Sequence, residues 1–199
     1  MTGFAHSVIS RTERYSGRVF TVVTDRVTMP GGGAADRDYL RHVGAVGVVA
    51  LDDEGRIVLI GQYRHAVGRR LWELPAGLRD VQGEELATGA LRELAEEADL
   101  RAGRIDVLID LHTSPGFTNE QIRIFLARDL SPVPEPERHD RTDEEADIEL
   151  RRVPLDEAVA MVFAGDITNA AAVAGVLAAA RARDLDWAPL RPSDAPTPA

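Results

Sequence analysis

The chain has 199 residues, 44% of them hydrophobic, which suits one soluble domain with a small appendage. It contains no cysteine and no lysine, so disulfides, thiolate metal sites and Schiff-base chemistry are excluded. The net charge of −10 argues against a general nucleic-acid binder. No apolar run approaches ~18 residues and the chain does not begin like a secretory signal, so we expect a cytoplasmic protein without a membrane partner.

The first part of the chain predicts pairs of short strands. Residues 17–27 and 37–40 lie on either side of a Pro-Gly-Gly-Gly turn at 30–33, which interrupts regular structure. Residues 43–51 and 56–63 are rich in valine and isoleucine and are joined by a short acidic loop. We therefore expect these two runs to form a hairpin or adjacent strands.

The rest of the chain predicts a central helix between strands and a final pair of helices. In order, these are residues 84–98 (helix), 105–111 and 121–127 (strands), 131–146 (long polar loop), 148–153 (strand), 155–163 and 169–183 (helices), and 189–199 (Pro-rich, frayed tail). Strands on both sides of a helix, followed by a helix pair, indicate an α/β sandwich with a mixed sheet.

The predicted central helix carries the main functional signal. At about 100° per residue, Glu93, Glu96 and Glu97 fall within one stripe, next to an apolar face that can pack into a core. Three converging carboxylates repel each other unless a cation lies between them. Oxygen ligands of this kind suit Mg²⁺ or Mn²⁺, which usually act with substrate phosphates. An isolated Glu-rich helix is more often a solvated surface, but a longer pattern surrounds this one.

That longer pattern resembles the Nudix box, written as Gly, five residues, Glu, seven residues, then Arg-Glu-aliphatic-x-Glu-Glu-x-Gly-aliphatic. Glu84, the Arg-Glu-Leu-Ala-Glu-Glu core that begins at Arg92, and Leu100 all match. Gly77 lies one residue too far from Glu84, and Asp99 stands where the box has its second glycine. The second change is tolerable because aspartate adopts the left-handed conformation of a helix cap better than most residues. The changed spacing concerns a loop and leaves the carboxylates of the helix in register.

Features outside the box resemble the ADP-ribose pyrophosphatase branch of this family. Residues 71–77 match its W-E-(L/I)-P-A-G lead-in, Arg64 ends a Gln-Tyr-Arg strand as in that branch, and Pro115 lies fifteen residues beyond Leu100. The resemblance implies an α/β/α Nudix domain over residues 42–185. It also implies a small N-terminal β-sheet extension over residues 1–41, through which relatives form homodimers with exchanged N-terminal pieces. We expect a flexible tail over residues 186–199.

The resemblance implies Mg²⁺-dependent hydrolysis of a nucleoside diphosphate sugar, ADP-ribose, to AMP and ribose 5-phosphate, with Mn²⁺ as a possible substitute metal. Glu93, Glu96, Glu97 and the backbone carbonyl of Ala76 would hold the metal, and Glu93 is also counted among the catalytic residues. We expect Arg92 to pair with a glutamate of the box and to hold its rotamer.

A general base is still needed, because the box carboxylates are engaged with metal. Relatives supply a glutamate from a loop well beyond the box, which corresponds here to residues 143–147. We take Glu145 as the base and Glu144 as its alternative. The residues that we expect at the substrate are Arg64, Arg37, Glu73, Leu78, Ser114, Gly116 and Glu120.

Two other functions stay open at this point. The first is hydrolysis of another nucleotide sugar, such as GDP-mannose, or of a dinucleotide. The second is a non-catalytic sensor of ADP-ribose-like ligands. Such sensors usually lose box carboxylates and carry a DNA-binding domain, whereas this chain keeps the carboxylates and has no helix-turn-helix segment. Zinc-ligand histidine spacing and a serine-hydrolase elbow are also missing from the sequence.

Overall fold

The computed structural model describes residues 6–142 and 146–198, which form two compact units. The first contains the chain up to Gly44 together with His112–Gln121. The second contains Ala45–Leu111 together with the chain from Ile122 onward. Residues 112–121 lie in the middle of the sequence, yet they group in space with the N-terminal strands.

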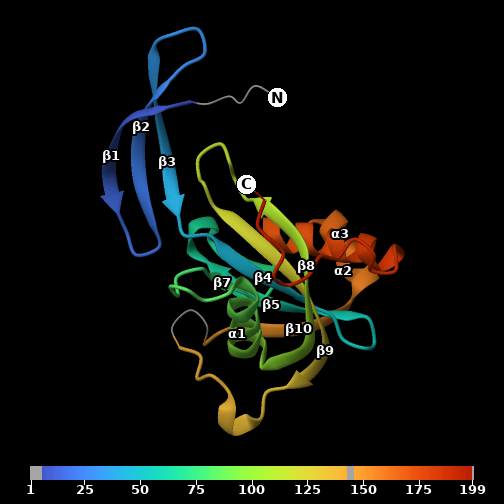
Figure 1. Cartoon of the computed structure of the whole chain (residues 1–199). Coiled ribbons are helices and arrows are strands. Elements are labelled where there is room, and N and C mark those ends of the chain that lie inside the picture. Colours follow the sequence, from blue (N-terminus) through green and yellow to red (C-terminus); the bar gives the residue numbers. More distant parts are fainter. Residues whose placement is uncertain (1–5, 143–145, 199) are drawn as a thin grey trace. The chain divides into compact units, whose positions relative to one another are not determined.

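The first unit is built on a three-stranded antiparallel sheet in the order β1-β2-β3 (Figure 1). Its strands are Val8–Ser16 (β1), Phe20–Thr28 (β2) and Ala34–His42 (β3). The sequence predicts β2 and part of β3. It misses β1 because this strand is mostly polar and all nine of its residues are exposed, so that it has no apolar alternation. The glycines at 31–33 have φ values of 90°, 91° and 96°, which glycine adopts without strain.

The loop that contains Pro115 is joined to β3 within the first unit. The Leu40 N–H donates to the Phe117 carbonyl at 2.8 Å, and the Asn119 N–H donates to the Leu40 carbonyl at 3.2 Å. The Asn119 side chain also accepts from the His42 N–H at 2.7 Å. These bonds give the loop a strand-like partner, which a turn motif in the sequence does not predict.

The second unit contains two sheets, one of four strands and one of three. The four-stranded sheet has the order β7-β4-β9-β8, with strands Ala76–Leu78, Ala45–Ala50, Gln121–Pro132 and Leu100–His112. The three-stranded sheet has the order β10-β5-β6, with strands Glu149–Pro154, Arg56–Arg64 and Arg69–Glu73. Strand β4 is antiparallel to β7 and parallel to β9, so the predicted mixed sheet is confirmed.

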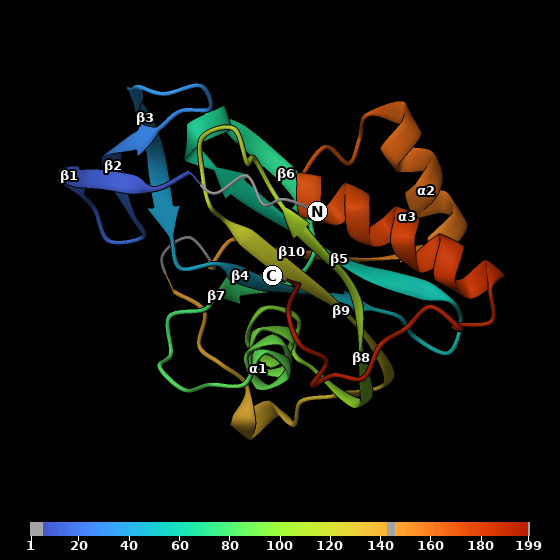
Figure 2. The ribbon, with the colours of Figure 1, turned by 45° about the horizontal axis from the view of Figure 1, so that its top comes forward.

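Helices cover both sides of these sheets, which gives the predicted α/β/α sandwich. Figures 1 and 2 show α1 on one side and α2 with α3 on the other. The helices are α1 (Leu86–Ala98), α2 (Leu155–Ala164) and α3 (Ala170–Asp184), with short 3₁₀ turns η1 (His65–Val67) and η2 (Glu135–Glu137). Helix α1 begins two residues later than the sequence predicts. Among the described residues, no helix is long and apolar enough to cross a membrane.

Strand β4 is buried on both faces and therefore reads as a continuous apolar run. Val46 and Val48 pack in the core cluster that contains Leu94 of α1. Val49 packs in the other core cluster, with Val176 of α3. This two-sided burial fixes α1 against the sheet, because successive side chains of a strand point to opposite faces.

The predicted pairing of residues 43–51 with 56–63 is wrong beyond one bridge. Leu51 and Ile57 form an isolated antiparallel bridge, and the strands then separate into different sheets. The turn between them is held by the Asp52 carboxylate, which accepts from the Glu54 and Arg56 N–H groups. Two largely apolar runs do not specify their partners, and here the parallel pairing of β4 with β9 replaces the hairpin.

The predicted frayed tail does not fit the contacts of the C-terminal segment. Arg191 and Val107 exchange backbone hydrogen bonds of 2.9 and 3.1 Å, and the Arg191 side chain donates to Asp110 at 2.6 Å. The Arg123 guanidinium donates to the carbonyls of Ala195 and Pro196. The tail therefore lies along β8 and caps a buried ion pair between Arg123 and Asp110, both less than 5% exposed.

Replacing Asp110 by Asn should lower the stability of the second unit. Burial would raise the pKa of Asp110, but hydrogen bonds from Arg123 and Arg191 lower it below its ordinary value. The neutral amide would leave the buried Arg123 without a countercharge, a loss of about 3 to 5 kcal/mol for pairs of this kind. Urea denaturation at neutral pH should show this difference in the midpoint of unfolding.

The pH dependence of this effect has a definite sign. Because the folded pKa of Asp110 is lowered, its contribution is complete above the unfolded pKa and is lost as the pH falls through the folded pKa. The difference in the urea midpoint of unfolding between wild type and Asp110→Asn should therefore become smaller at acidic pH. Arg191→Ala, at a side chain that is 36% exposed, is the milder control. Equal midpoints for wild type and Asp110→Asn at neutral pH would contradict this account.

Candidate active site

The carboxylates of α1 lie at the edge of the core. Glu93 and Glu97 are buried, with 9% and 5% of their surface exposed, and Glu96 is partly exposed. Ala90 and Leu94 hold the same helix in the core cluster that it shares with β4 and β9. Buried charges are costly unless they are paired and hydrogen-bonded, so these glutamates require partners from neighbouring segments.

Arg92 supplies the first of these partners. Its Nη1 donates to Glu93 at 2.7 Å and to Glu96 at 3.1 Å, and its Nε and Nη2 each donate to Glu84 at 3.2 Å. The hydrogen bond to Glu84 and the charge of Glu93 raise the pKa of Arg92 above its ordinary value. The expected pairing of Arg92 with a glutamate of the box is confirmed, and Glu84, which lies before the helix, orients the arginine.

The backbone of β7 supplies the second set of contacts. The Ala76 N–H donates to the Glu97 carboxylate at 2.8 Å. A Cβ atom on Gly77 would lie 2.0 Å from the Glu93 carboxylate oxygen, so a side chain at this position would force the carboxylate out of its place. The glycine therefore meets the box carboxylate in spite of the altered spacing to Glu84. The additional residue lies in the loop between β7 and α1.

These elements surround one open cleft of about 280 Å³. It is lined by Gln62 and Arg64 from β5, by residues 76–78 and Asp80, and by the charged residues of α1, namely Arg92, Glu93, Glu96 and Glu97. The sequence-predicted residues that the cleft brings together are Arg64, Ala76, Leu78, Glu93, Glu96 and Glu97. Four acidic and two basic side chains line it, which gives the cleft an excess of negative charge.

The donor set of the cleft suits a divalent cation that prefers oxygen. Carboxylate and carbonyl oxygens are the usual ligands of Mg²⁺ and Mn²⁺. In this conformation Nη1 of Arg92 lies within hydrogen-bonding distance of both Glu93 and Glu96. Within the described ranges, no three His, Cys, Asp or Glu side chains converge closely enough to hold an ion. An ion between Glu93 and Glu96 would replace Nη1 of Arg92 as their partner.

Arg64 and Glu73 form a two-pronged ion pair at the same cleft. Nε and Nη2 of Arg64 donate to the two carboxylate oxygens of Glu73 at 2.9 and 2.7 Å. The Glu73 side chain is 4% exposed, whereas that of Arg64 is 44% exposed. Glu73 is absent from the cleft lining and orients the arginine through these two bonds. Both residues were expected at the substrate, but here Glu73 contacts Arg64.

The Asp99 side chain forms a hydrogen bond that the sequence did not predict. Asp99 ends α1 with φ 54° and ψ 36°, so the expected left-handed cap is confirmed. Arg141 donates to the Asp99 carboxylate at 2.7 Å and to the Glu96 carbonyl at 2.8 Å. The aspartate in place of glycine thus ties the polar loop after β9 to the end of α1. The aspartate at position 99, where the box has glycine, indicates that this position has a partner. Nothing in the sequence identifies Arg141 as that partner.

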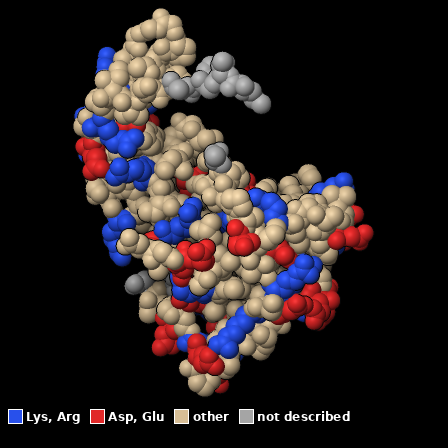
Figure 3. Space-filling view, viewed as in Figure 1, with Lys and Arg blue, Asp and Glu red and all other residues tan. Residues whose placement is uncertain are grey.

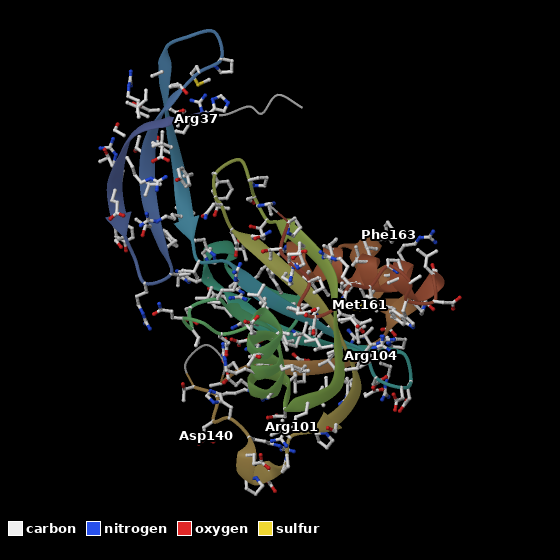
Figure 4. All side chains as sticks on the ribbon, in the orientation of Figure 1. Arg37, Arg101, Arg104, Asp140, Met161 and Phe163 are labelled. Atoms are coloured by element: carbon white, nitrogen blue, oxygen red, sulfur yellow. The ribbon has the colours of Figure 1, made fainter. Side chains whose placement is uncertain are left out.

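The remaining predicted site residues are not part of this cleft. Arg37 lies on β3, as Figure 4 shows, and belongs to the first unit. Ser114, Gly116 and Glu120 belong to that unit as well, where Glu120 accepts a hydrogen bond from Thr113. Glu144 and Glu145 lie outside the described residues.

Comparison with known proteins agrees with this geometry. The model of the NUDIX domain matches residues 41–174. An ADP-ribose pyrophosphatase of Mycobacterium tuberculosis is 49% identical over 170 residues, 85% of this chain and 81% of the relative. One of Bacillus subtilis is 34% identical over 85% of this chain and 90% of the relative. A solved ADP compounds hydrolase has a similar fold, with a TM-score of 0.76 at 23% identity, covering 91% and 95% of the two chains.

The family match covers the described segments that build the cleft. It begins before β4 and ends within α3, so that β5, β7 and α1 all lie inside it. The carboxylates of α1, the glycine that meets them and the arginine that pairs with them are therefore parts of one family motif. This chain belongs to the Nudix family.

Proposed function

We propose that the protein hydrolyses ADP-ribose to AMP and ribose 5-phosphate with Mg²⁺. The observation that carries this proposal is the meeting of Glu93 and Glu97 with the backbone of Ala76 and Gly77 in a cleft that also presents Arg64. Negative oxygens and an oriented guanidinium in one site suit a metal-bound pyrophosphate. The two relatives named above as ADP-ribose pyrophosphatases support the choice of substrate.

Glu93, Glu96, Glu97 and the Ala76 carbonyl would hold the metal. When bound, the ion supplies neutralisation of the pyrophosphate charge and polarisation of the attacking water. Arg92 keeps the glutamates in position through its bonds to Glu84, Glu93 and Glu96. These contacts keep the carboxylates at the cleft in the absence of metal, and a bound ion would take the place of Nη1 between Glu93 and Glu96.

Arg64 is the residue of this cleft that we assign to the phosphates of the substrate. Its guanidinium is held by Glu73 and is nearly half exposed, so it can donate to phosphate oxygens without losing that orientation. A cleft of about 280 Å³ is at the lower end of ligand-pocket volumes, which suits a pyrophosphate better than a whole nucleotide sugar. For the rest of the substrate we propose Leu78, Arg37, Ser114, Gly116 and Glu120, as the family resemblance implies. Glu73 would act through Arg64.

The charge distribution agrees with a small-molecule substrate. Figure 3 shows acidic and basic side chains intermixed on the face in view, with no continuous basic stripe among the described residues there. Binding along a nucleic-acid backbone depends on such a stripe. The net charge of −10 also favours a site in which metal ions offset the repulsion of an anionic substrate.

The purified protein with Mg²⁺ should release AMP and ribose 5-phosphate from ADP-ribose, and faster than it cleaves GDP-mannose or a dinucleotide. EDTA should stop the reaction, and Mg²⁺ or Mn²⁺ should restore it. Glu93→Gln and Glu97→Gln keep the shape of the side chain but lose the charge that holds metal. Each should reduce kcat/KM by well over ~10²-fold, which is at least ~2.7 kcal/mol of transition-state stabilisation.

Glu85→Gln is the control for these two variants, because Glu85 is exposed and makes no side-chain cap bond at the start of α1. It should keep nearly full activity. Chromatographic separation of the products identifies the bond that is cleaved. If the protein binds ADP-ribose but releases no product with any metal, the hydrolase proposal is wrong and the sensor function is favoured. If GDP-mannose is the better substrate, the proposed specificity is wrong.

For the general base we propose Glu145, with Glu144 as the alternative. The described residues on both sides of this pair are bonded to helix α1 and to strand β6. Arg141 is bonded to the end of α1, and the Asp147 carbonyl accepts from Arg70 of β6 at 2.7 Å. Helix α1 lines the cleft, and β6 pairs with β5, which also lines it.

Glu145→Gln should lower kcat by ~10² to 10⁴-fold, the usual contribution of a general base. The KM for ADP-ribose and the affinity for Mn²⁺ should change far less, because neither depends chiefly on proton transfer. Steady-state kinetics at saturating metal provide the measurement. Glu144→Gln is the matched control and should be milder. A reversed order would assign the base to Glu144, whereas less than a tenfold loss in both variants would exclude the pair.

We also propose that the N-terminal sheet forms a homodimer interface. Its outer strand β1 is exposed along its whole length, and a three-stranded sheet with uncovered apolar side chains needs a partner. The large exposed apolar residues described in this unit are Val8, Ile9, Tyr15, Val19, Phe20, Val43 and Phe117.

Ile9→Asp should convert a dimer to a monomer, because a buried unpaired charge strongly disfavours association. Size-exclusion chromatography with light scattering measures the mass directly. Phe163→Asp is the control, since Phe163 is the most exposed of the large apolar side chains described, at 81%, and lies on α2 rather than on the N-terminal sheet. The interface is misplaced if Ile9→Asp elutes at the wild-type dimer mass, or if both variants dissociate equally.

A further inference from the structure

Gln62 is a buried polar residue of the cleft that the proposed mechanism does not use. It is 6% exposed, and its amide oxygen Oε1 has no hydrogen-bond partner within the described part of the chain. The residue nevertheless lines the cleft together with Glu93, Glu96 and Glu97. A buried acceptor without a donor is unfavourable, and native structures contain few of them.

The register of β5 places Gln62 on the functional face of its sheet. Side chains alternate along a strand, so Ile60, Gln62 and Arg64 share one face. Val58, on the same face, packs in the core cluster of α1. Glu73 pairs with Ile60 across the two strands and reaches Arg64 with both carboxylate oxygens. Gln62 therefore lies between a core residue and the arginine that we assign to phosphate.

Packing alone favours an apolar residue at this position. From Ile57 to Ile60, β5 is an unbroken run of buried aliphatic side chains, and a leucine or methionine would continue it. The guanidiniums that line the cleft are bonded to acids, Arg64 to Glu73 and Arg92 to three glutamates. No donor among the described residues reaches Oε1, which leaves a ligand of the cleft to supply one.

The chemistry of the cleft limits what that donor can be. The oxygens of an ionised pyrophosphate accept hydrogen bonds and do not donate them. Water bound to a divalent cation is a strong donor, because the charge of the ion polarises its O–H bonds. Mg²⁺ in particular usually keeps several of its waters when it binds to protein carboxylates.

We propose that Gln62 is a positioning residue for the metal, with Oε1 accepting a hydrogen bond from a water bound to the divalent ion in the cleft. This inference rests on the metal site of the proposed function. Residues that bond to the ligands of a metal, and not to the metal itself, typically contribute 10- to 100-fold to its affinity. Gln62 would thus stabilise the loaded site at a cost to the metal-free fold.

The test compares Gln62→Met, which keeps the length of the side chain but cannot accept this bond, with Gln62→Glu, which keeps the acceptor. Mn²⁺ binding to the intact protein is followed by electron paramagnetic resonance of the free ion, and thermal unfolding is measured without metal. Gln62→Met should bind Mn²⁺ about 10- to 100-fold more weakly, with an unchanged or higher Tm. Its activity should recover at saturating Mn²⁺. Gln62→Glu should bind Mn²⁺ at least as tightly as wild type.

Ile60→Val is the matched control, since it removes one methyl group from the same face of β5 without touching a hydrogen bond. It should lower Tm and leave Mn²⁺ binding within twofold of wild type. Mn²⁺ affinity of Gln62→Met within twofold of wild type overturns the inference, as does weakened binding in Gln62→Glu or no Mn²⁺ binding by wild type. A wild type that binds Mn²⁺ but leaves ADP-ribose intact would instead refute the proposed function and leave this role of Gln62 standing.

Discussion

Repulsion among the glutamates of α1 is the constraint on which the rest of the cleft depends. Glu93 and Glu97 lie one turn apart on the buried side of a helix, where water cannot screen them well. The Arg92 guanidinium donates to Glu93, and the Ala76 N–H donates to Glu97. Gly77 has no side chain, which lets its backbone lie close to the Glu93 carboxylate. These contacts offset the repulsion between the carboxylates and keep them at the cleft.

The absence of lysine makes arginine the common partner of acids throughout the chain. A guanidinium can hold a carboxylate with two parallel hydrogen bonds, which fixes orientation as well as charge. Arg64 uses this geometry with Glu73 at the cleft, and Arg123 uses it with Asp110 beneath the C-terminal segment. The same chemistry therefore holds Arg64 at the cleft and anchors the C-terminal segment.

The sequence by itself determined the part of the site that lies within one helix. The spacing of Glu93, Glu96 and Glu97 places them on one stripe because the helical period is a property of the local backbone. The left-handed cap at Asp99 follows from the same local rules, and both are confirmed. The mixed sheet was predictable as well, because buried apolar runs alternating with helices have few stable arrangements.

Tertiary structure alone decided which distant segments meet. Strand β4 pairs with β9, and it meets β5 only at one isolated bridge. The sequence could not predict this, because aliphatic side chains do not distinguish one strand partner from another. The contact of Gly77 with Glu93, the bond of Arg141 to Asp99 and the burial of Gln62 in the cleft all join segments far apart in the chain. Hydrophobic packing sets these distances, since the shared core fixes how α1 lies against the sheets.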